Sequence, residues 1–249
     1  MERLAERWRA GKARGGERRG GEYLWRLIFP PRCLTCAVLL PAGAEAPLCR
    51  SCLSSFIPAG PLCPRCGELL PPAAPCSCIP ESAPLRGLFA LSWYEGAWRQ
   101  MLHRFKFRGK RSLARPLGSW LGRLIREETC WEPAFVIPVP LHRRRLRERG
   151  YDQAQLLARF AATALGVPLR PLLARIRPTA AQSSLSHHQR QENVRGVFAC
   201  RRAALPGKRA LLVDDIYSTG ATMQEAAAVL QKQGLVVFGA VAAFTQRPS

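Results

Sequence analysis

The stretch LLVDDIYSTGAT, residues 211–222, joins an apolar run, two adjacent carboxylates and a small hydroxyl-rich turn that leads into a helix. The apolar run predicts a buried strand, with Asp214 and Asp215 at its carboxyl end. Open α/β sheets bind ligands at the carboxyl ends of their strands. The helix that follows would present free backbone N–H groups and a partial positive charge at its first turn. The stretch therefore predicts an α/β fold with an anion site at this edge of the sheet.

The same residues favour a sugar phosphate as the ligand. A phosphate would be held by the turn residues Ser218, Thr219, Gly220, Ala221 and Thr222. Carboxylates aimed at that phosphate would repel it, whereas the same carboxylates would hydrogen-bond the hydroxyls of an attached sugar. A Walker lysine is missing, which argues against a nucleoside triphosphate. The alternative is purely structural: one aspartate caps the turn, and Ser218 or Thr219 caps the helix.

The flanking sequence extends this unit into a parallel sheet with flanking helices. Apolar periodicity predicts strands at 88–94, 135–139, 209–213 and 235–244, and helices around 98–105, 113–125, 157–164 and 222–233. A strand, helix and strand in succession implies a right-handed crossover between parallel strands. The run LHRRRLRERG, residues 141–150, is interpreted as a basic loop, and residues 175–196 as a long flexible loop.

Eight of the ten cysteines form four close pairs within residues 33–78. Two thiolates on one tight turn both reach a tetrahedral Zn²⁺ at about 2.3 Å, and Gly67 supplies the positive φ that such a turn commonly needs. The segment has few large apolar residues, so metal would replace a core. We therefore predict two structural zinc sites of four cysteines each rather than disulfides, with the pairing of the sites left open. The ligands would be Cys33, Cys36, Cys49, Cys52, Cys63, Cys66, Cys76 and Cys78.

The charge of the chain is strongly positive, with 38 Lys and Arg against 17 Asp and Glu among 249 residues, a net charge of +21. Residues 99–149 alone carry 14 basic and 4 acidic side chains. Such a field favours polyanionic partners, nucleic acid or phosphorylated metabolites, although a solvated face on an arginine-rich protein is the plain alternative. No apolar run is long enough to span a membrane, and residues 1–22 read as a basic disordered tail without a secretory signal, so we expect a cytoplasmic protein.

Beyond these patterns, the chain resembles the ComF/GntX family, in which a double zinc ribbon precedes a type I phosphoribosyltransferase-like domain. The resemblance covers residues 23–246 and rests on four continuous segments: FPPRC with the cysteine pairs, HRFKFRGK, PVPLHRRRLRERGYDQAQLLAR and VDDIYSTGAT. A spread pattern adds Arg177, Thr179, Gln182, Leu185, Arg190, Asn193, Arg195, Gly196 and Phe198. Asp152 departs from the family, which more often has Asn there. The resemblance divides the chain into a tail (1–22), a double zinc ribbon (23–80) and a phosphoribosyltransferase-like domain (84–249).

The resemblance also implies roles for single residues toward phosphoribosyl pyrophosphate (PRPP) and Mg²⁺. Asp214 and Asp215 would hold the ribose hydroxyls as the catalytic pair, and residues 218–222 the 5′-phosphate. The pyrophosphate loop would comprise Pro140, Leu141, His142, Arg143, Arg149 and Gln153, with Arg144 and Arg145 close by. The flexible loop 175–196 would close over the site with Arg177, Gln182 and Arg190.

The function implied is PRPP binding in a protein linked to DNA uptake and natural transformation. Whether the chain turns PRPP over with an unidentified acceptor stays open. One alternative is a non-catalytic module that binds single-stranded DNA through the zinc ribbons and the basic residues of 99–149. The other is a platform on which the zinc ribbon docks DNA-uptake or competence proteins.

Overall fold

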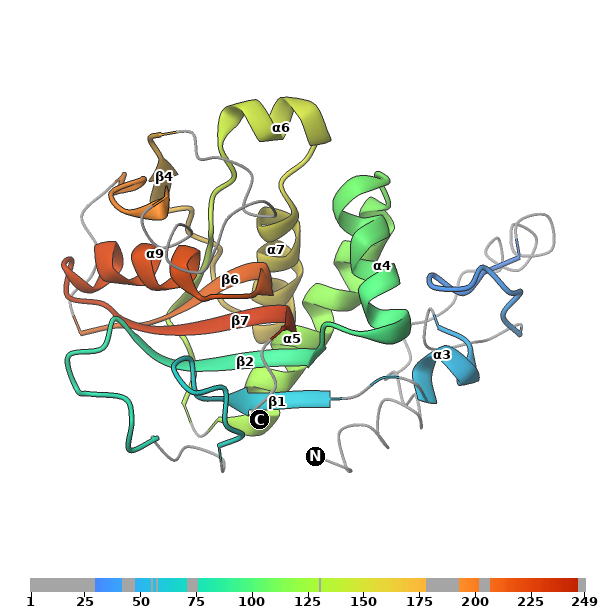
Figure 1. Ribbon diagram of the computed structural model, residues 1–249, viewed down its shortest axis with the longest axis horizontal. Coiled ribbons are helices and arrows are strands. Elements are labelled where there is room, and N and C mark those ends of the chain that lie inside the picture. The colour runs from blue at the N-terminus through green and yellow to red at the C-terminus, as the bar shows by residue number, and fades with distance from the viewer. Residues whose placement is uncertain are drawn as a thin grey trace.

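The computed structural model describes residues 30–41, 48–54, 56, 58–70, 76–129, 131–177, 193–201 and 207–245. Its centre is a five-stranded sheet in the order β1-β2-β7-β6-β3 (Figure 1). The strands are β1 Pro58–Leu62, β2 Leu85–Trp93, β3 Phe135–Pro138, β6 Arg209–Tyr217 and β7 Val236–Phe244. Strands β2, β7, β6 and β3 are mutually parallel, which confirms the predicted α/β class.

Strand β1 comes from the cysteine-rich segment and pairs antiparallel with β2 at the edge of the sheet. The sequence PAGPL carries no strand pattern, and we did not predict this strand. An edge strand tolerates proline because one side of its backbone needs no ladder partner. The cysteine-rich segment is thus tied directly into the main sheet.

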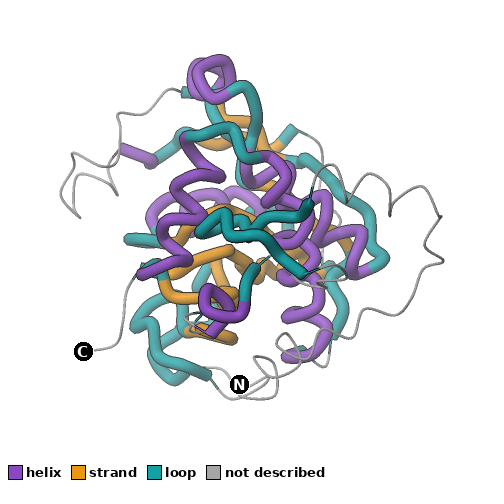
Figure 2. The backbone as a smooth tube through the Cα atoms, turned by 90° about the vertical axis from the view of Figure 1, so that its right-hand side faces the viewer, coloured by secondary structure: helices purple, strands orange, loops and turns teal. Residues whose placement is uncertain are grey.

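Helices cover both faces of the sheet, and alternate residues of β6 show which helix lies on which face. Leu211 and Val213 pack in one apolar cluster with α5 (Ala114–Glu128) and α7 (Gln153–Leu165). Leu212 packs in a second cluster with α9 (Ala221–Gln231). Figure 2 shows the strands in the middle of the molecule with helices around them. Both faces are buried, which explains why the strands read as continuous apolar runs.

The helices α5 and α7 approach closely because α5 carries glycine at the contact. A Cβ on Gly118 would lie 2.5 Å from the carbonyl oxygen of Leu157. Helix α4 (Gly96–Phe107) joins the same cluster through Trp98, Met101, Leu102 and Phe105, the stripe predicted from the sequence. Short elements complete the described fold: α3 Arg50–Ser54, a 3-10 turn Arg111–Leu113, and the hairpin β4 Leu173–Arg175 with β5 Phe198–Cys200.

The predicted basic loop at 141–150 is wrong, because residues Arg143–Arg149 form the helix α6 (Figure 1). The helix is capped by His142, whose Nδ1 accepts from the backbone N–H of Arg144 at 3.2 Å, and ends at Gly150 in the left-handed region. Arg144 and Glu148 form an i,i+4 ion pair of 3.1 Å. With Leu146 as its one apolar residue, the run has no hydrophobic periodicity to indicate a helix.

The predicted flexible loop 175–196 begins inside strand β4 and ends before β5. Most of it, including Gln182 and Arg190, lies outside the described residues, as does the predicted tail 1–22. In the part of the chain that is described, no helix has both the length and the apolar character to cross a membrane.

Candidate functional site: a cleft and two cysteine clusters

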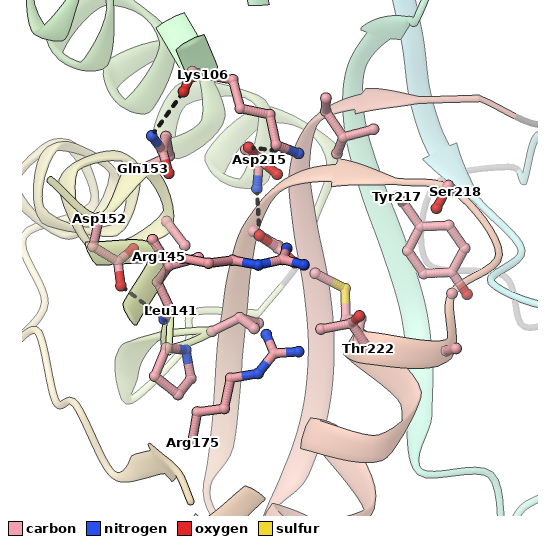
Figure 3. A pocket seen from close by; sticks show the side chains of 18 of the residues that line it. Lys106, Leu141, Arg145, Asp152, Gln153, Arg175, Asp215, Tyr217, Ser218 and Thr222 are labelled. Atoms are coloured by element: carbon pink, nitrogen blue, oxygen red, sulfur yellow. Dashed lines mark hydrogen bonds and ion pairs between the residues drawn. The ribbon is translucent and has the colours of Figure 1, made fainter. Parts of the chain in front are cut away.

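A cleft opens at the carboxyl ends of β3 and β6, at the edge of the sheet predicted to bind a ligand (Figure 3). The cleft is open to solvent, and its empty volume, with the solvent-filled mouth included, is about 730 Å³. The N-termini of α7 and α9, the end of α4, the helix α6 and the strand β4 all contribute to its walls. Its lining brings together Asp214, Asp215, residues 218–222, Pro140, Leu141, Arg149 and Gln153, all of them predicted site residues.

The two adjacent aspartates enter different environments because successive residues of a strand face opposite ways. Asp215 is buried, and its Oδ2 lies 3.3 Å from Nζ of Lys106 at the end of α4. Asp214 accepts a 2.8 Å hydrogen bond from the backbone N–H of Asp215. Burial and the neighbouring charge of Asp215 raise the pKa of Asp214 to about 8. The pair therefore offers one ion-paired carboxylate and one that holds a proton readily near neutral pH.

The turn 218–222 passes from β6 into the first residues of α9. Gly220 lies in the left-handed region at φ 77°, where a residue with a side chain would be strained. The first N–H groups of α9 have no carbonyl partner within the helix, so they are available to an anion. The turn therefore presents free backbone N–H groups to the cleft.

Two arginines enter the cleft opposite this turn. Arg145 comes from α6 and Arg175 from β4, and Figure 3 shows both side chains reaching into the cleft from the wall opposite the turn. Burial lowers the pKa of each, and the charges of Arg149 and Arg145 respectively lower it further. Like charges gathered in one cleft favour a ligand with several negative charges.

The start of α7 fixes the floor of the cleft through Asp152. One carboxylate oxygen caps α7 by accepting from the backbone N–H of Gln155 at 3.0 Å. The other accepts from the N–H of Leu141 at 2.9 Å and so holds the β3–α6 connection in place. In an asparagine one of these two atoms would be an NH2 group, which cannot accept, so the carboxylate bonds the two N–H groups through separate oxygens.

Some predicted residues fall outside the cleft lining, and some lining residues were not predicted. His142 and Arg143 do not line it, and Arg177 donates to the carbonyls of Arg195 and Gly196 instead. Among the lining residues, Lys106, Asp152, Arg175 and Tyr217 were not predicted as site residues, whereas Arg145 is one of the arginines expected close to the pyrophosphate loop. Arg145 and Arg149 are four residues apart, and a helical reading of the run would have placed both on one face. No sequence signal marks Arg175.

The eight predicted cysteine ligands form two groups of four. Within each group, Cys33, Cys36, Cys49 and Cys52 or Cys63, Cys66, Cys76 and Cys78, the sulfur atoms lie within 4.8 Å of one another. Sulfurs around a tetrahedral Zn²⁺ at about 2.3 Å are about 3.8 Å apart. The observed Sγ–Sγ distances include 3.6 Å for Cys36–Cys49 and 3.8 Å for Cys66–Cys76. The donor set therefore fits two zinc ions, and the pairing left open by the sequence is sequential.

The two cysteine knuckles repeat one backbone pattern thirty residues apart. The N–H of Cys33 bonds the carbonyl of Val38 at 2.8 Å, as the N–H of Cys63 bonds that of Glu68. The residue at the turn has a positive φ in both, 63° at Ala37 and 76° at Gly67. This confirms the prediction for Gly67 and shows that Ala37 occupies the same position at a conformational cost.

Comparison with known proteins agrees with this two-part description. Residues 24–79 match the double zinc ribbon domain family, and residues 153–249 match the phosphoribosyl transferase domain family. Competence protein F of Haemophilus influenzae is 32% identical over 217 residues, covering 84% of this chain and 94% of that protein. The DNA utilization protein YhgH of Salmonella typhimurium is also 32% identical, with 84% and 94% covered. Competence protein ComFC of Bacillus subtilis is 28% identical, with 86% and 85% covered.

Proposed function

The chain belongs to the ComF/GntX family, which joins a double zinc ribbon to a phosphoribosyltransferase domain, and from this premise we propose that its cleft binds PRPP together with Mg²⁺. One observation carries the proposal: two carboxylates at the end of β6 lie beside a hydroxyl-rich turn and opposite two arginines. The carboxylates can accept hydrogen bonds from the hydroxyls of a pentose, and the backbone N–H groups of the turn can donate to its 5′-phosphate. The arginines suit the pyrophosphate at the other end of the same ligand.

Within this proposal each residue has a task. Asp214 and Asp215 accept hydrogen bonds from the two ribose hydroxyls, and Lys106 holds Asp215 in position through their 3.3 Å ion pair. The N–H groups at the start of α9 receive the 5′-phosphate. Arg145 and Arg175 neutralise charge on the pyrophosphate and favour its departure. Mg²⁺, which binds through phosphates and one or two carboxylates, supplies further neutralisation of the same group when present.

Thermal unfolding with PRPP and Mg²⁺ tests the binding proposal. At a ligand concentration one hundred times Kd, binding stabilises the native protein by about 3 kcal/mol, which raises Tm by roughly 5–10 °C for a chain of this size. The variant Asp214→Asn with Asp215→Asn should lose this response. A matched control neutralises two adjacent acids at the end of α5, Glu127→Gln with Glu128→Gln, and should keep it. An equal Tm rise in both variants would remove the site assignment.

We further propose that the chain transfers the phosphoribosyl group to an acceptor. Release of pyrophosphate from PRPP and Mg²⁺, followed against a panel of free bases and oligonucleotides, tests this directly. Acceptor-dependent release that disappears in Asp214→Asn with Asp215→Asn supports an enzyme. Tight PRPP binding with no release for any acceptor supports a binding module instead.

The names of the relatives, competence protein and DNA utilization protein, support a role in DNA uptake, and we propose this role in the cytoplasm, where thiols that bind zinc stay reduced. Helix α6 is the observation that favours contact with single-stranded DNA or another partner of the uptake machinery. Its residues Arg143, Arg144 and Arg147 are exposed, whereas Arg145 enters the cleft. Replacing the three exposed arginines by Gln should weaken oligonucleotide binding and flatten its salt dependence without changing PRPP binding. Identical salt titrations would remove this contact.

A further inference from the structure

Tyr217 connects the second cysteine cluster (Cys63, Cys66, Cys76 and Cys78) to the turn 218–222, called the phosphate turn below. It is the last residue of β6, between the carboxylate pair and the turn 218–222, and its side chain is buried. Its hydroxyl donates a 2.6 Å hydrogen bond to the carbonyl oxygen of Pro64. Pro64 lies inside the knuckle formed by Cys63 and Cys66, two ligands of the second zinc site. A segment 153 residues away in sequence therefore reaches the base of the turn.

The same hydroxyl supports the backbone of the turn. A Cβ built on Gly220 would overlap the Tyr217 hydroxyl, so the glycine backbone packs directly against it. The amide of Gln224, one turn into α9, lies 3.5 Å from the same oxygen. The ring of Tyr217 stacks on Phe244 of β7 with centroids 5.2 Å apart. The position of the hydroxyl thus helps to fix the position of the turn and of the first turn of α9.

The knuckle on the other side of this hydrogen bond depends on its metal. The described residues of the second ribbon loop, 63–70 and 76–80, bury no large aliphatic or aromatic side chain, and their thiols need a cation to share one site as thiolates. Four thiolates share one small site only when a divalent cation compensates their charge. Zinc loading therefore determines how firmly the carbonyl of Pro64 is held.

The first zinc site has different neighbours and provides an internal comparison. In its knuckle, the carbonyls of Leu34 and Thr35 accept from the guanidinium of Arg104 on α4. Arg104 does not line the cleft. Of the two knuckles, the second is the one with a described hydrogen bond to the residue that supports the phosphate turn.

We propose that Tyr217 is a positioning residue that couples the second zinc site to the phosphate turn, so that zinc at Cys63, Cys66, Cys76 and Cys78 raises the affinity of the cleft for a sugar phosphate. The proposal rests on the function proposed above and adds its dependence on metal. Because coupling between two binding sites is reciprocal, a sugar phosphate in the cleft also raises the zinc affinity of the second site by the same factor.

The first experiment measures ribose 5-phosphate binding to the full, zinc-loaded chain by calorimetry. The variant Cys66→Ser with Cys76→Ser removes the second zinc and should weaken binding five- to twenty-fold. The matched control, Cys36→Ser with Cys49→Ser, removes the first zinc and should change the affinity less than two-fold. Zinc content should be two ions in the wild type and one in each variant, which confirms that each pair of substitutions removes a single zinc. Equal affinity in the wild type and the second-site variant overturns the proposal.

The second experiment isolates the hydroxyl with Tyr217→Phe, which keeps the ring and both zinc sites. Ribose 5-phosphate should bind three- to ten-fold more weakly, and removing the second zinc from this variant should have no further effect beyond two-fold. A competing chromophoric chelator reports the zinc affinity of the second site, which should rise with ribose 5-phosphate in the wild type and stay constant in Tyr217→Phe. If ribose 5-phosphate raises the zinc affinity of the second site equally in the wild type and in Tyr217→Phe, the role of Tyr217 is overturned, even where the cysteine variants fail to fold.

Failure of the two proposals is distinguishable. A wild type that binds neither PRPP nor ribose 5-phosphate overturns the proposed function. A wild type that binds both, with an affinity independent of the second zinc and of the Tyr217 hydroxyl, overturns the coupling and leaves the proposed function in place.

Discussion

Asp214→Asn should stabilise the unliganded protein, and the gain should grow with pH. The pKa of Asp214 is raised from 3.8 to about 8 in the folded chain, by burial first and by Asp215 second. The folded state therefore keeps a proton that the unfolded state releases, and stability falls as pH rises from about 4 to about 8. This is opposite to the behaviour of an aspartate in a favourable ion pair.

The magnitude follows from the size of that shift. Each pKa unit corresponds to about 1.4 kcal/mol. The raised pKa of Asp214 therefore lowers the free energy of unfolding by about 3 kcal/mol at pH 6 and about 6 kcal/mol at pH 9, before any screening. Lys106 and Arg175 face the carboxylate pair, and water enters the open cleft, which reduces the cost. We therefore expect Asp214→Asn to gain about 1–2 kcal/mol more over the wild type at pH 9 than at pH 6.

Urea unfolding of the zinc-loaded wild type and variant at pH 6, 7.5 and 9 measures this difference, because both zinc sites stay deprotonated enough to hold metal over this range. The control Glu127→Gln changes the net charge equally on the exposed end of α5 and should show a constant difference. If the stability gain of Asp214→Asn is constant or shrinks with pH, the aspartate is not held in a desolvated site, and our description of the cleft is incorrect.

Three further substitutions test single contacts. Ala37→Gly should raise the free energy of unfolding by about 0.5–1 kcal/mol, because φ is 63° there and the equivalent turn residue is Gly67; unchanged urea midpoints would contradict this. Gly118→Ala should lower the free energy of unfolding by about 2 kcal/mol or more, since its Cβ would lie 2.5 Å from a carbonyl of α7, and a neutral effect in the same assay would mean that α5 and α7 are not so close. Gly220→Ala should abolish calorimetric binding of ribose 5-phosphate, since its Cβ would overlap the Tyr217 hydroxyl at a φ of 77°; normal affinity would exclude this turn as the phosphate-binding site.

The parts of the fold that the sequence predicted are those specified by local pattern. The apolar runs before Asp214 and after Gly234, with a helix between them, implied neighbouring parallel strands, and β6 and β7 are parallel neighbours. Strand β1 was missed because two prolines and a glycine among five residues carry no strand signal, and only pairing with β2 makes it extended. Helix α6 was missed because capping by His142 and an ion pair stabilise it, rather than a buried face.

The candidate site divides in the same way. Residues 214–222 are contiguous, so the sequence alone was enough to predict their chemistry. The spacing of the cysteines was likewise enough to predict both zinc sites. Lys106 and Arg175 come from two elements that are remote in sequence, and only the tertiary fold brings them to the carboxylates. The contact between Tyr217 and Pro64 joins residues that the sequence assigned to separate domains, so no local pattern predicts it.

A crystal structure of the zinc-loaded protein with PRPP and Mg²⁺ tests the central claim most directly. Our account predicts the ribose hydroxyls within hydrogen-bond distance of the Asp214 and Asp215 carboxylates, the 5′-phosphate on the backbone N–H groups of residues 218–222, and the pyrophosphate beside Arg145 and Arg175. A ligand bound elsewhere on the chain, or one in the cleft with its hydroxyls turned away from both aspartates, would contradict it.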